Sequence, residues 1–270
     1  MQILESLKNK KAVFCEKPLA SSLADTRALY DLADEMKTPL FCSLNRRFDP
    51  SLNQVRNHLQ EETFGKPLVV KTTARDYPIP PIEFLRTSGG MVHDCGIHDI
   101  DYVCWMLNAY PDEVYCTGFC YDPNIKALGD YDNVTVILKF TKPREIIATL
   151  DLSRRGVYGY DQRVEILCEN GMLESQHQRS SGLVVTPALT SKNMLPGGTT
   201  TSPILTSFPQ RYADSYKLAM HSFISSVKSS SAVAICRQSV IFSILVADAA
   251  DRSLHTGKSV KIDYEKLSIN

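Results

Sequence analysis

Hydrophobic and polar positions follow one period in the first part of the chain and another in the rest. Over residues 1–44, two short apolar runs, AVFC and PLFCSL, flank a segment from about Ser22 to Met36 with apolar positions at helical spacing. Ser22 with Asp25 forms a capping box that marks the start of this helix, and an amphipathic ILESLKN precedes the first run. Helix and strand therefore alternate, which predicts parallel βαβ pairing.

From about Asp49 onward the pattern changes to consecutive strands. A helix (SLNQVRNHLQ) leads into a strand (PLVVKTTARD), a proline-rich loop and a helix through HDIDYVCWML. Five runs with period-two alternation then follow almost directly: DEVYCTGFCYD, NVTVILKF, EIIATLDLS, RVEILCEN and MLESQ. This order predicts a large, mostly antiparallel sheet. We expect a surface loop over 180–207 and two final helices, from about 210 to 228 and from about 237 to 255.

Composition and charge exclude several classes of protein. With 43% hydrophobic and 22% charged residues, the 270-residue chain is expected to be globular. Its thirty basic residues balance thirty acidic ones, so no net field favours nucleic acid or a membrane surface. The apolar run over 239–247 is far shorter than the ~20 residues that span a bilayer. We expect a cytoplasmic protein with reduced cysteines and neither a nucleic-acid nor a membrane partner.

The first chemically informative stretch is VFCEKPLA, Val13 to Ala20. Pro18 cannot continue a central strand or a helix, so Lys17 is predicted at the carboxyl end of a parallel strand. Ligands of open α/β sheets bind at that edge, which makes Lys17 a candidate for chemistry. A solvated charge in an ordinary loop explains the same residues equally well.

A second candidate site lies in SGGMVHDCGIHDID, Ser88 to Asp101. If the segment is helical from about Asp94, then Asp94, His98 and Asp101 share one face. An imidazole beside carboxylates is a tunable proton acceptor at neutral pH. The alternative is a polar helix start in which Asp94 is a cap and His98 bonds to backbone.

A metal site through His93, Cys95 and His98 is disfavoured by their spacing. The sequence offers no second ligand pair at zinc-finger spacing. On a helix, His93 and Cys95 would also point away from the direction of His98. We therefore predict no bound metal.

Four motifs, in the same order, resemble those of the glucose-fructose oxidoreductase and inositol 2-dehydrogenase family. They are VFCEKPLA, NRRFDP, GGMVHDCGIHDID and VADAADRSLHTGKSVKI, and the resemblance covers essentially the whole chain. The stretch ARDYPIPPIEFLRTSGGMVHDCGIHDID is most similar to the inositol 2-dehydrogenase branch. The resemblance implies an oxidoreductase that transfers a hydride between NAD or NADP and a secondary alcohol of a cyclic polyol or sugar.

The resemblance also implies a fold and a division of the chain. Residues 1–44 correspond to a partial dinucleotide-binding domain, the remnant of a doubly wound parallel (Rossmann) sheet. Residues 45–270 correspond to an α+β domain with a large, mostly antiparallel open sheet, which binds substrate and mediates oligomerisation. A dimer or tetramer is expected.

Site roles follow from the same resemblance, residue by residue. Lys17, followed by a proline whose bond is often cis, would contact cofactor and substrate, His98 would take the proton, and Asp101 would hold His98. Asp94 would pair with Lys17 or orient a substrate hydroxyl. Weaker candidates for substrate contact are Arg75, Asp76 and Tyr212, and Tyr212 could equally be a packing residue. The cofactor-binding set implied is Glu16, Lys17, Pro18, Asn45 and Arg46, with Arg47 adjacent.

One family feature is absent from this sequence. A dinucleotide fold receives the pyrophosphate at a G-x-G-x-x-G turn, and no such turn occurs in the chain. By this comparison the first strands, about 80 residues, are missing, so we expect an N-terminally truncated chain that binds NAD(H) or NADP(H) weakly. The alternative function is a catalytically incompetent isoform that acts as an oligomerisation or polyol-binding subunit.

Overall fold

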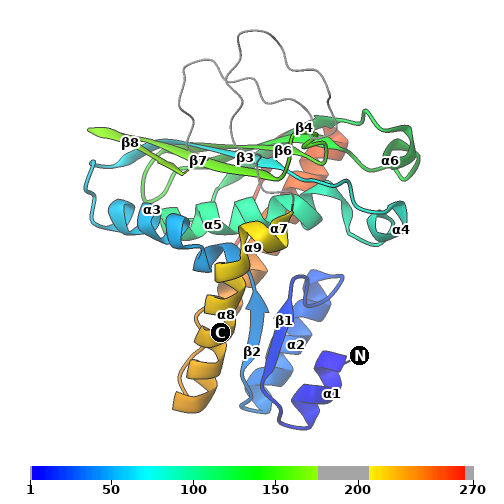
Figure 1. Ribbon diagram of the computed structural model, residues 1–270, viewed down its shortest axis with the longest axis vertical. Coiled ribbons are helices and arrows are strands. Elements are labelled where there is room, and N and C mark those ends of the chain that lie inside the picture. The colour runs from blue at the N-terminus through cyan, green and yellow to red at the C-terminus, as the bar shows by residue number, and fades with distance from the viewer. Residues whose placement is uncertain (1, 176–206, 265–270) are drawn as a thin grey trace.

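The computed structural model describes residues 2–175 and 207–264 and contains two sheets (Figure 1). The strands are β1 (Val13–Glu16), β2 (Leu40–Ser43), β3 (Pro67–Arg75), β4 (Glu113–Phe119), β5 (Asn133–Phe140), β6 (Ile146–Ser153), β7 (Asp161–Cys168), β8 (Gly171–Ser175) and β9 (Val260–Lys261). The helices are α1 (Gln2–Lys8), α2 (Leu23–Glu35), α3 (Pro50–Gln60), α4 (Ile82–Leu85), α5 (Ile97–Leu107), α6 (Pro123–Ala127), α7 (Phe208–Arg211), α8 (Ala213–Ser229) and α9 (Arg237–Thr256). A 3₁₀ turn, η1 (Asn45–Phe48), and a π-helical turn, η2 (Val92–Gly96), complete the described elements.

The strand pairing confirms the predicted fold class. β1 and β2 pair in parallel, as expected for a βαβ unit whose helix is α2. The seven-stranded sheet has the order β8-β7-β3-β6-β5-β4-β9, and among its described strands only β3 and β6 pair in parallel. A fragment of a parallel-sheet domain is therefore joined to a mostly antiparallel sheet.

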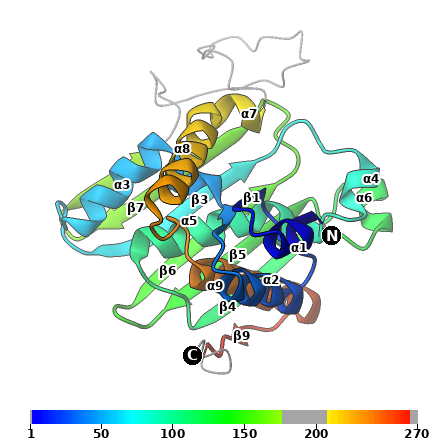
Figure 2. The same cartoon turned by 90° about the horizontal axis from the view of Figure 1, so that it is seen from below.

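One face of the large sheet is covered by helices. In Figures 1 and 2, α3, α5 and α9 lie along this face. The sequence of β6 explains why one face of the sheet is buried. Its apolar residues Ile146, Ala148 and Leu150 alternate with more exposed residues, as the period of two in a strand requires. These side chains join a core that includes Ile100 and Val103 of α5. The core therefore fixes α5, which carries one half of the candidate site, against the sheet.

The smaller sheet packs against α8, which comes from the far end of the chain (Figure 1). Phe14 of β1 stacks on Phe41 of β2 with ring centroids 5.1 Å apart, and Phe223 of α8 meets Phe14 at 5.6 Å. This second core also contains Leu7 of α1. Apolar burial thus holds β1, and with it the position of Lys17, against a helix of the C-terminal part.

Several short elements differ from the sequence-based expectation. The predicted helix over 210–228 is split at Tyr212 into α7 and α8, with φ −111° and ψ 20° at that residue. The helices α4 and α6 and the strand β9 have only two to five residues, too short for a periodic pattern to reveal. The predicted loop over 180–207 lies, except for Ser207, outside the described residues.

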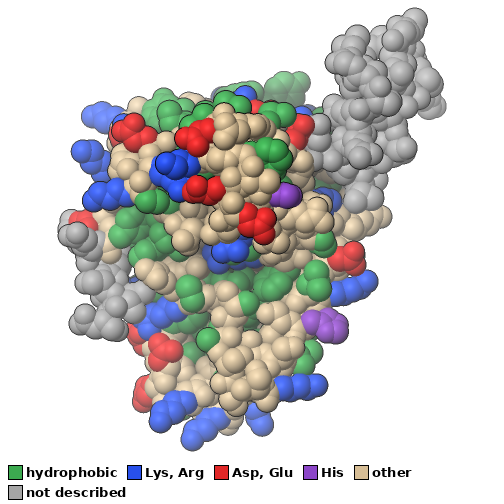
Figure 3. Space-filling model, turned by 90° about the vertical axis from the view of Figure 1, so that its left-hand side faces the viewer, with side chains coloured by type: hydrophobic (Ala, Val, Ile, Leu, Met, Phe, Trp, Pro, Cys, Tyr) green, Lys and Arg blue, Asp and Glu red, His purple; other side chains and the backbone are tan. Residues whose placement is uncertain are grey.

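The described part of the chain has a surface of mixed charge and free cysteines. Figure 3 shows acidic and basic side chains interspersed over the upper half of one face. Within residues 2–175 and 207–264, no helix is long and apolar enough to cross a bilayer. All eight cysteines are free.

The start of α2 provides a test of the capping interpretation. The Ser22 hydroxyl accepts a hydrogen bond from the backbone N–H of Asp25 at 3.0 Å. Replacing Ser22 with alanine is expected to lower the free energy of unfolding by about 1 kcal/mol, because that N–H loses its partner. Denaturant unfolding measures the change. The exposed neighbour Ser21→Ala is the control, with an expected effect within about 0.5 kcal/mol, and equal losses for both variants would contradict the capping role.

Candidate active site

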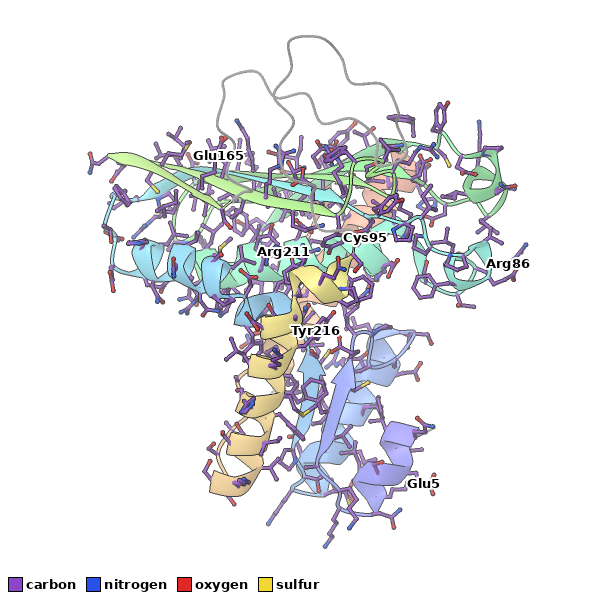
Figure 4. The ribbon with its side chains drawn as sticks, in the orientation of Figure 1. Glu5, Arg86, Cys95, Glu165, Arg211 and Tyr216 are labelled. Carbon is purple, nitrogen blue, oxygen red and sulfur yellow. The ribbon has the colours of Figure 1, made fainter. Side chains whose placement is uncertain are left out.

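A cavity of about 740 Å³ lies where the two parts of the molecule meet. Figure 4 places Cys95, Arg211 and Tyr216 at this junction, beneath the large sheet and above β1 and β2. The carboxyl end of β1, the turns η1 and η2, α4, and the α7–α8 junction all contribute to its wall. The lining residues are Glu16, Lys17, Asn45, Arg46, Asp76, Tyr77, Pro78, Pro80, Pro81, Phe84, Asp94, Cys95, His98, Tyr160, Ser207, Phe208, Tyr212 and Tyr216.

Lys17 reaches this cavity directly from the end of β1. The strand ends at Glu16, and the Lys17–Pro18 peptide bond is cis. The Lys17 Nζ donates to the backbone carbonyl of Asp94 at 2.5 Å and to Asp94 Oδ1 at 3.0 Å. The structure therefore brings together two residues that are 77 positions apart in the sequence.

Asp94 lies in the π-helical turn η2, and cations hold both oxygens of its carboxylate. Lys17 contacts Oδ1, and Arg154 Nη1 donates to Oδ2 at 2.8 Å. Burial opposes ionisation of this carboxyl group, but the two positive charges and their hydrogen bonds outweigh it and hold the pKa of Asp94 below its usual value. Asp94 is therefore an anion at neutral pH.

His98 lies one turn further on, in the first turn of α5, and lines the same cavity. Its Nδ1 is buried without a hydrogen-bond partner among the described residues. Burial, together with the charges of Lys17 and Arg46, lowers the pKa of His98 well below its usual value. The imidazole is thus neutral at pH 7 and can accept a proton from a ligand in the cavity.

The expectation that Asp101 holds His98 is wrong. Asp101 is buried and accepts both hydrogen bonds of a bidentate pair with Arg47, at 2.8 Å from Nε and 2.6 Å from Nη2. Ser243 of α9 donates to the same carboxylate at 3.1 Å. The guanidinium fork matches a carboxylate geometrically, and a buried arginine needs such a partner, so this pair outcompetes the imidazole. Arg47 is accordingly turned away from the cavity.

Arg46 remains at the cavity wall and is held by three neighbours. Its Nη1 donates to Asp99 at 2.6 Å, and its guanidinium lies 5.6 Å and 5.7 Å from the ring centroids of Tyr102 and Tyr212. Tyr212 is therefore both a packing residue and a lining residue. The adjacent Asn45 also lines the cavity, with its amide nitrogen buried and unpartnered among the described residues.

Asp76 lines the cavity, whereas Arg75 does not. Successive residues at the end of a strand point to opposite sides, and Arg75 donates to Asp151 of the neighbouring strand at 2.5 Å. The expected substrate contact of Arg75 is therefore wrong. Asp76 accepts a hydrogen bond from the Cys95 thiol at 2.7 Å, and burial raises its pKa despite that bond.

Sequence reasoning missed Arg154, which contacts Asp94 from behind the cavity, and the lining residues Tyr160 and Tyr216. Arg154 matters most because of its contact with Asp94. It follows the last residue of β6 and is fully buried, with no exposed side-chain surface. Nothing in its local sequence marks it, because arginines are rarely buried and this one meets Asp94 only in the fold.

Within the described residues, no cluster of potential ligands could hold a metal ion.

The low pKa of His98 makes stability depend on pH. Below the usual histidine pKa of about 6.5, the unfolded chain binds a proton at His98 that the folded chain does not, so stability falls as the pH falls through this window. This loss is at most about 1.4 kcal/mol per pH unit. We expect His98→Gln to unfold with a shallower pH dependence than the wild type between pH 7.5 and 5.5. The exposed His221→Gln variant is the control, and identical slopes for wild type and His98→Gln would contradict the burial of a neutral imidazole.

Comparison with known proteins identifies the domains around this site. Residues 1–43 match the model of the oxidoreductase family with an NAD-binding Rossmann fold. Residues 52–174 match that of the GFO/IDH/MocA C-terminal domain.

Curated relatives and solved structures align over almost the whole chain. The myo-inositol 2-dehydrogenase of Thermotoga maritima is 34% identical over 262 residues, which are 97% of this chain and 75% of that protein. The inositol 2-dehydrogenase of Rhizobium meliloti is 32% identical, over 93% of this chain and 74% of that one. A myo-inositol dehydrogenase structure from Corynebacterium glutamicum superposes with a TM-score of 0.83 at 26% identity, covering 97% of this chain and 76% of that one. The chain therefore belongs to the GFO/IDH/MocA family of oxidoreductases, and its relatives include inositol 2-dehydrogenases.

Proposed function

We propose that the protein oxidises a secondary alcohol of a cyclic polyol of the inositol class in this cavity, with NAD as the hydride acceptor. The observation that carries the proposal is the convergence of Lys17, Asp94 and His98 on one cavity. The relatives named inositol 2-dehydrogenases support the substrate class. NAD is favoured over NADP because one relative, 27% identical, is a scyllo-inositol 2-dehydrogenase (NAD(+)).

The residues beside the cavity fit the nicotinamide end of such a cofactor. Asn45 offers a buried amide N–H group that has no partner among residues 2–175 and 207–264, and the carboxamide oxygen of nicotinamide is an acceptor for it. Glu16 and Lys17 at the end of β1 and Arg46 in η1 complete this wall, whereas the exposed Pro18, whose peptide bond with Lys17 is cis, does not line the cavity. When bound, the nicotinamide ring supplies the acceptor for the hydride that leaves the carbinol carbon.

Each catalytic side chain has a role that its chemistry supports. The His98 imidazole takes the hydroxyl proton as the C–H bond breaks and the C=O bond forms. The Lys17 ammonium stabilises the negative charge that develops on that oxygen. Asp94 keeps the ammonium in place through two short contacts. Asp76 and Tyr212 present polar groups that bind further hydroxyls of the ring.

The decisive experiment is an assay of NADH formation by the purified protein with myo-inositol, scyllo-inositol and a linear polyol as substrates. Because the sequence has no G-x-G-x-x-G turn and weak cofactor binding is expected, NAD is supplied in large excess. Under that condition we expect turnover with at least one inositol and little with the linear polyol, because a ring presents its hydroxyls in fixed directions. Calorimetric titration with each inositol measures binding independently. If the protein neither binds nor oxidises any cyclic polyol, the proposal fails. Turnover would also exclude the alternative of a catalytically incompetent subunit.

A further inference from the structure

We propose that Arg154 is a positioning residue of this active site, fixing the Asp94 carboxylate from the side opposite Lys17 and thereby setting where the Lys17 ammonium lies. The inference rests on the proposed function for its catalytic consequence. Its structural part concerns only side chains of this chain. Arg154 does not line the cavity, so it acts through Asp94.

The first argument is the division of the carboxylate between two cations. Lys17 Nζ donates a hydrogen bond to Asp94 Oδ1 at 3.0 Å, while Arg154 Nη1 donates one to Asp94 Oδ2 at 2.8 Å. A carboxylate with one cation on each oxygen cannot rotate without breaking one contact. Since Lys17 is 15% exposed and Arg154 is completely buried, Arg154 is the fixed side of this arrangement.

The second argument is that stabilisation of the fold does not account for Arg154. Its Nε and Nη2 groups are buried and lack hydrogen-bond partners within residues 2–175 and 207–264. Burying unpaired N–H groups of a charged side chain destabilises a fold. Its short charged contact is with Asp94, and the thiol of Cys95 lies 3.4 Å from the same Nη1. The hydrogen bonds that the Arg154 guanidinium does make therefore go to two residues that line the cavity, Asp94 and Cys95.

The third argument is the position of Asp130 at the other end of the guanidinium. Asp130 Oδ2 lies 3.8 Å from Arg154 Nη2, and Oδ1 accepts from the backbone N–H of Met91 at 2.9 Å. Met91 directly precedes η2, and Gly90 before it has φ +86°. Arg154 thus lies between the carboxylate that the turn presents and the residue that anchors the start of the turn.

The charge of Arg154 has a measurable signature at Asp94. The two cations hold the pKa of Asp94 below its usual value against burial. Without Arg154, burial is opposed by Lys17 alone, so we expect the titration midpoint of Asp94 in Arg154→Met to rise by about 1–3 units. Arg154→Lys keeps a charge but not the planar fork, so its midpoint should rise less.

The experiment is an NMR titration of the Asp94 side-chain carbon in the full chain, from pH 7 to the acid limit of the folded state. The signal is assigned with Asp94→Asn. Arg237→Met is the control, because Arg237 pairs with Asp31 and Asp34 far from the cavity. If Arg154→Met does not fold, Arg154→Lys provides the same comparison. Coinciding curves for wild type and the Arg154 variants would overturn the proposal.

Asp130→Asn separates the charge effect from a purely structural one. Asparagine keeps an acceptor for the Met91 N–H, and loss of the negative charge leaves Arg154 free to act on Asp94. The Asp94 midpoint should therefore not rise in Asp130→Asn. A rise as large as that of Arg154→Met would show that Arg154 acts only by holding the turn, and would overturn the proposal.

Kinetics supply the catalytic readout. In Arg154→Met, protonation of Asp94 at its raised midpoint should add a fall in kcat/KM for inositol oxidation that the wild type does not show at the same pH, with partial recovery in Arg154→Lys. Absence of any wild-type turnover would instead refute the proposed function. The NMR titration would still decide the role of Arg154 in that case.

Discussion

Lys17→Met is expected to lower kcat for inositol oxidation by about 100- to 1,000-fold, with a much smaller change in KM. Methionine has a similar length and can occupy the same path from the end of β1, but it carries no charge. The lost ammonium acts on negative charge that develops on the substrate oxygen only in the transition state, so the rate falls more than ground-state binding does.

Steady-state kinetics of the wild type and Lys17→Met across a range of inositol concentrations provide the test. Lys71→Met is the matched control, because Lys71 is 61% exposed on the large sheet and pairs with Glu165. Its kcat should equal that of the wild type. A Lys17→Met enzyme with unchanged kcat would show that the contact of Lys17 with Asp94 serves the fold alone.

Much of the architecture could be predicted because it is written in local periodicity. The βαβ unit was visible from the alternation of strand and helix around Ser22, and the structure confirms its parallel pairing and its cap. The antiparallel sheet followed from consecutive runs of period two. By contrast, β9 has two residues and pairs with β4 at a separation of more than 140 positions, which no local pattern encodes.

The candidate site shows the same limit. Lys17 could be placed at the end of a strand because Pro18 ends it, and Asp94 with His98 has a spacing that a helix brings to one face. The partner of Asp101 could not be predicted, because helical spacing identifies neighbours within α5 but not the Arg47 that packs across from η1. The π-helical turn carrying Asp94 and the buried Arg154 behind it depend on contacts between distant segments.

His98→Gln is expected to lower kcat/KM for inositol oxidation by about 100- to 10,000-fold, the range for loss of a general base. Glutamine keeps a polar side chain of similar size but cannot accept and release the proton. Because the pKa of His98 lies well below its usual value, the wild-type imidazole is already neutral at pH 7. The wild-type rate should therefore stay level on the acidic side of neutrality, well past the pH at which an ordinary histidine protonates.

The pH profile separates a proton acceptor from a residue that only shapes the cavity. Protonation of His98 should cause an acid limb in the wild-type kcat/KM, and this limb should be absent from the residual activity of His98→Gln. His93→Gln is the control, since His93 lies in the same segment but pairs with Asp248 and does not line the cavity. Its rate and profile should match the wild type. If His98→Gln instead retained the wild-type rate, the proton would have to leave through another group, and Asp76, whose pKa burial raises, would be the first to test.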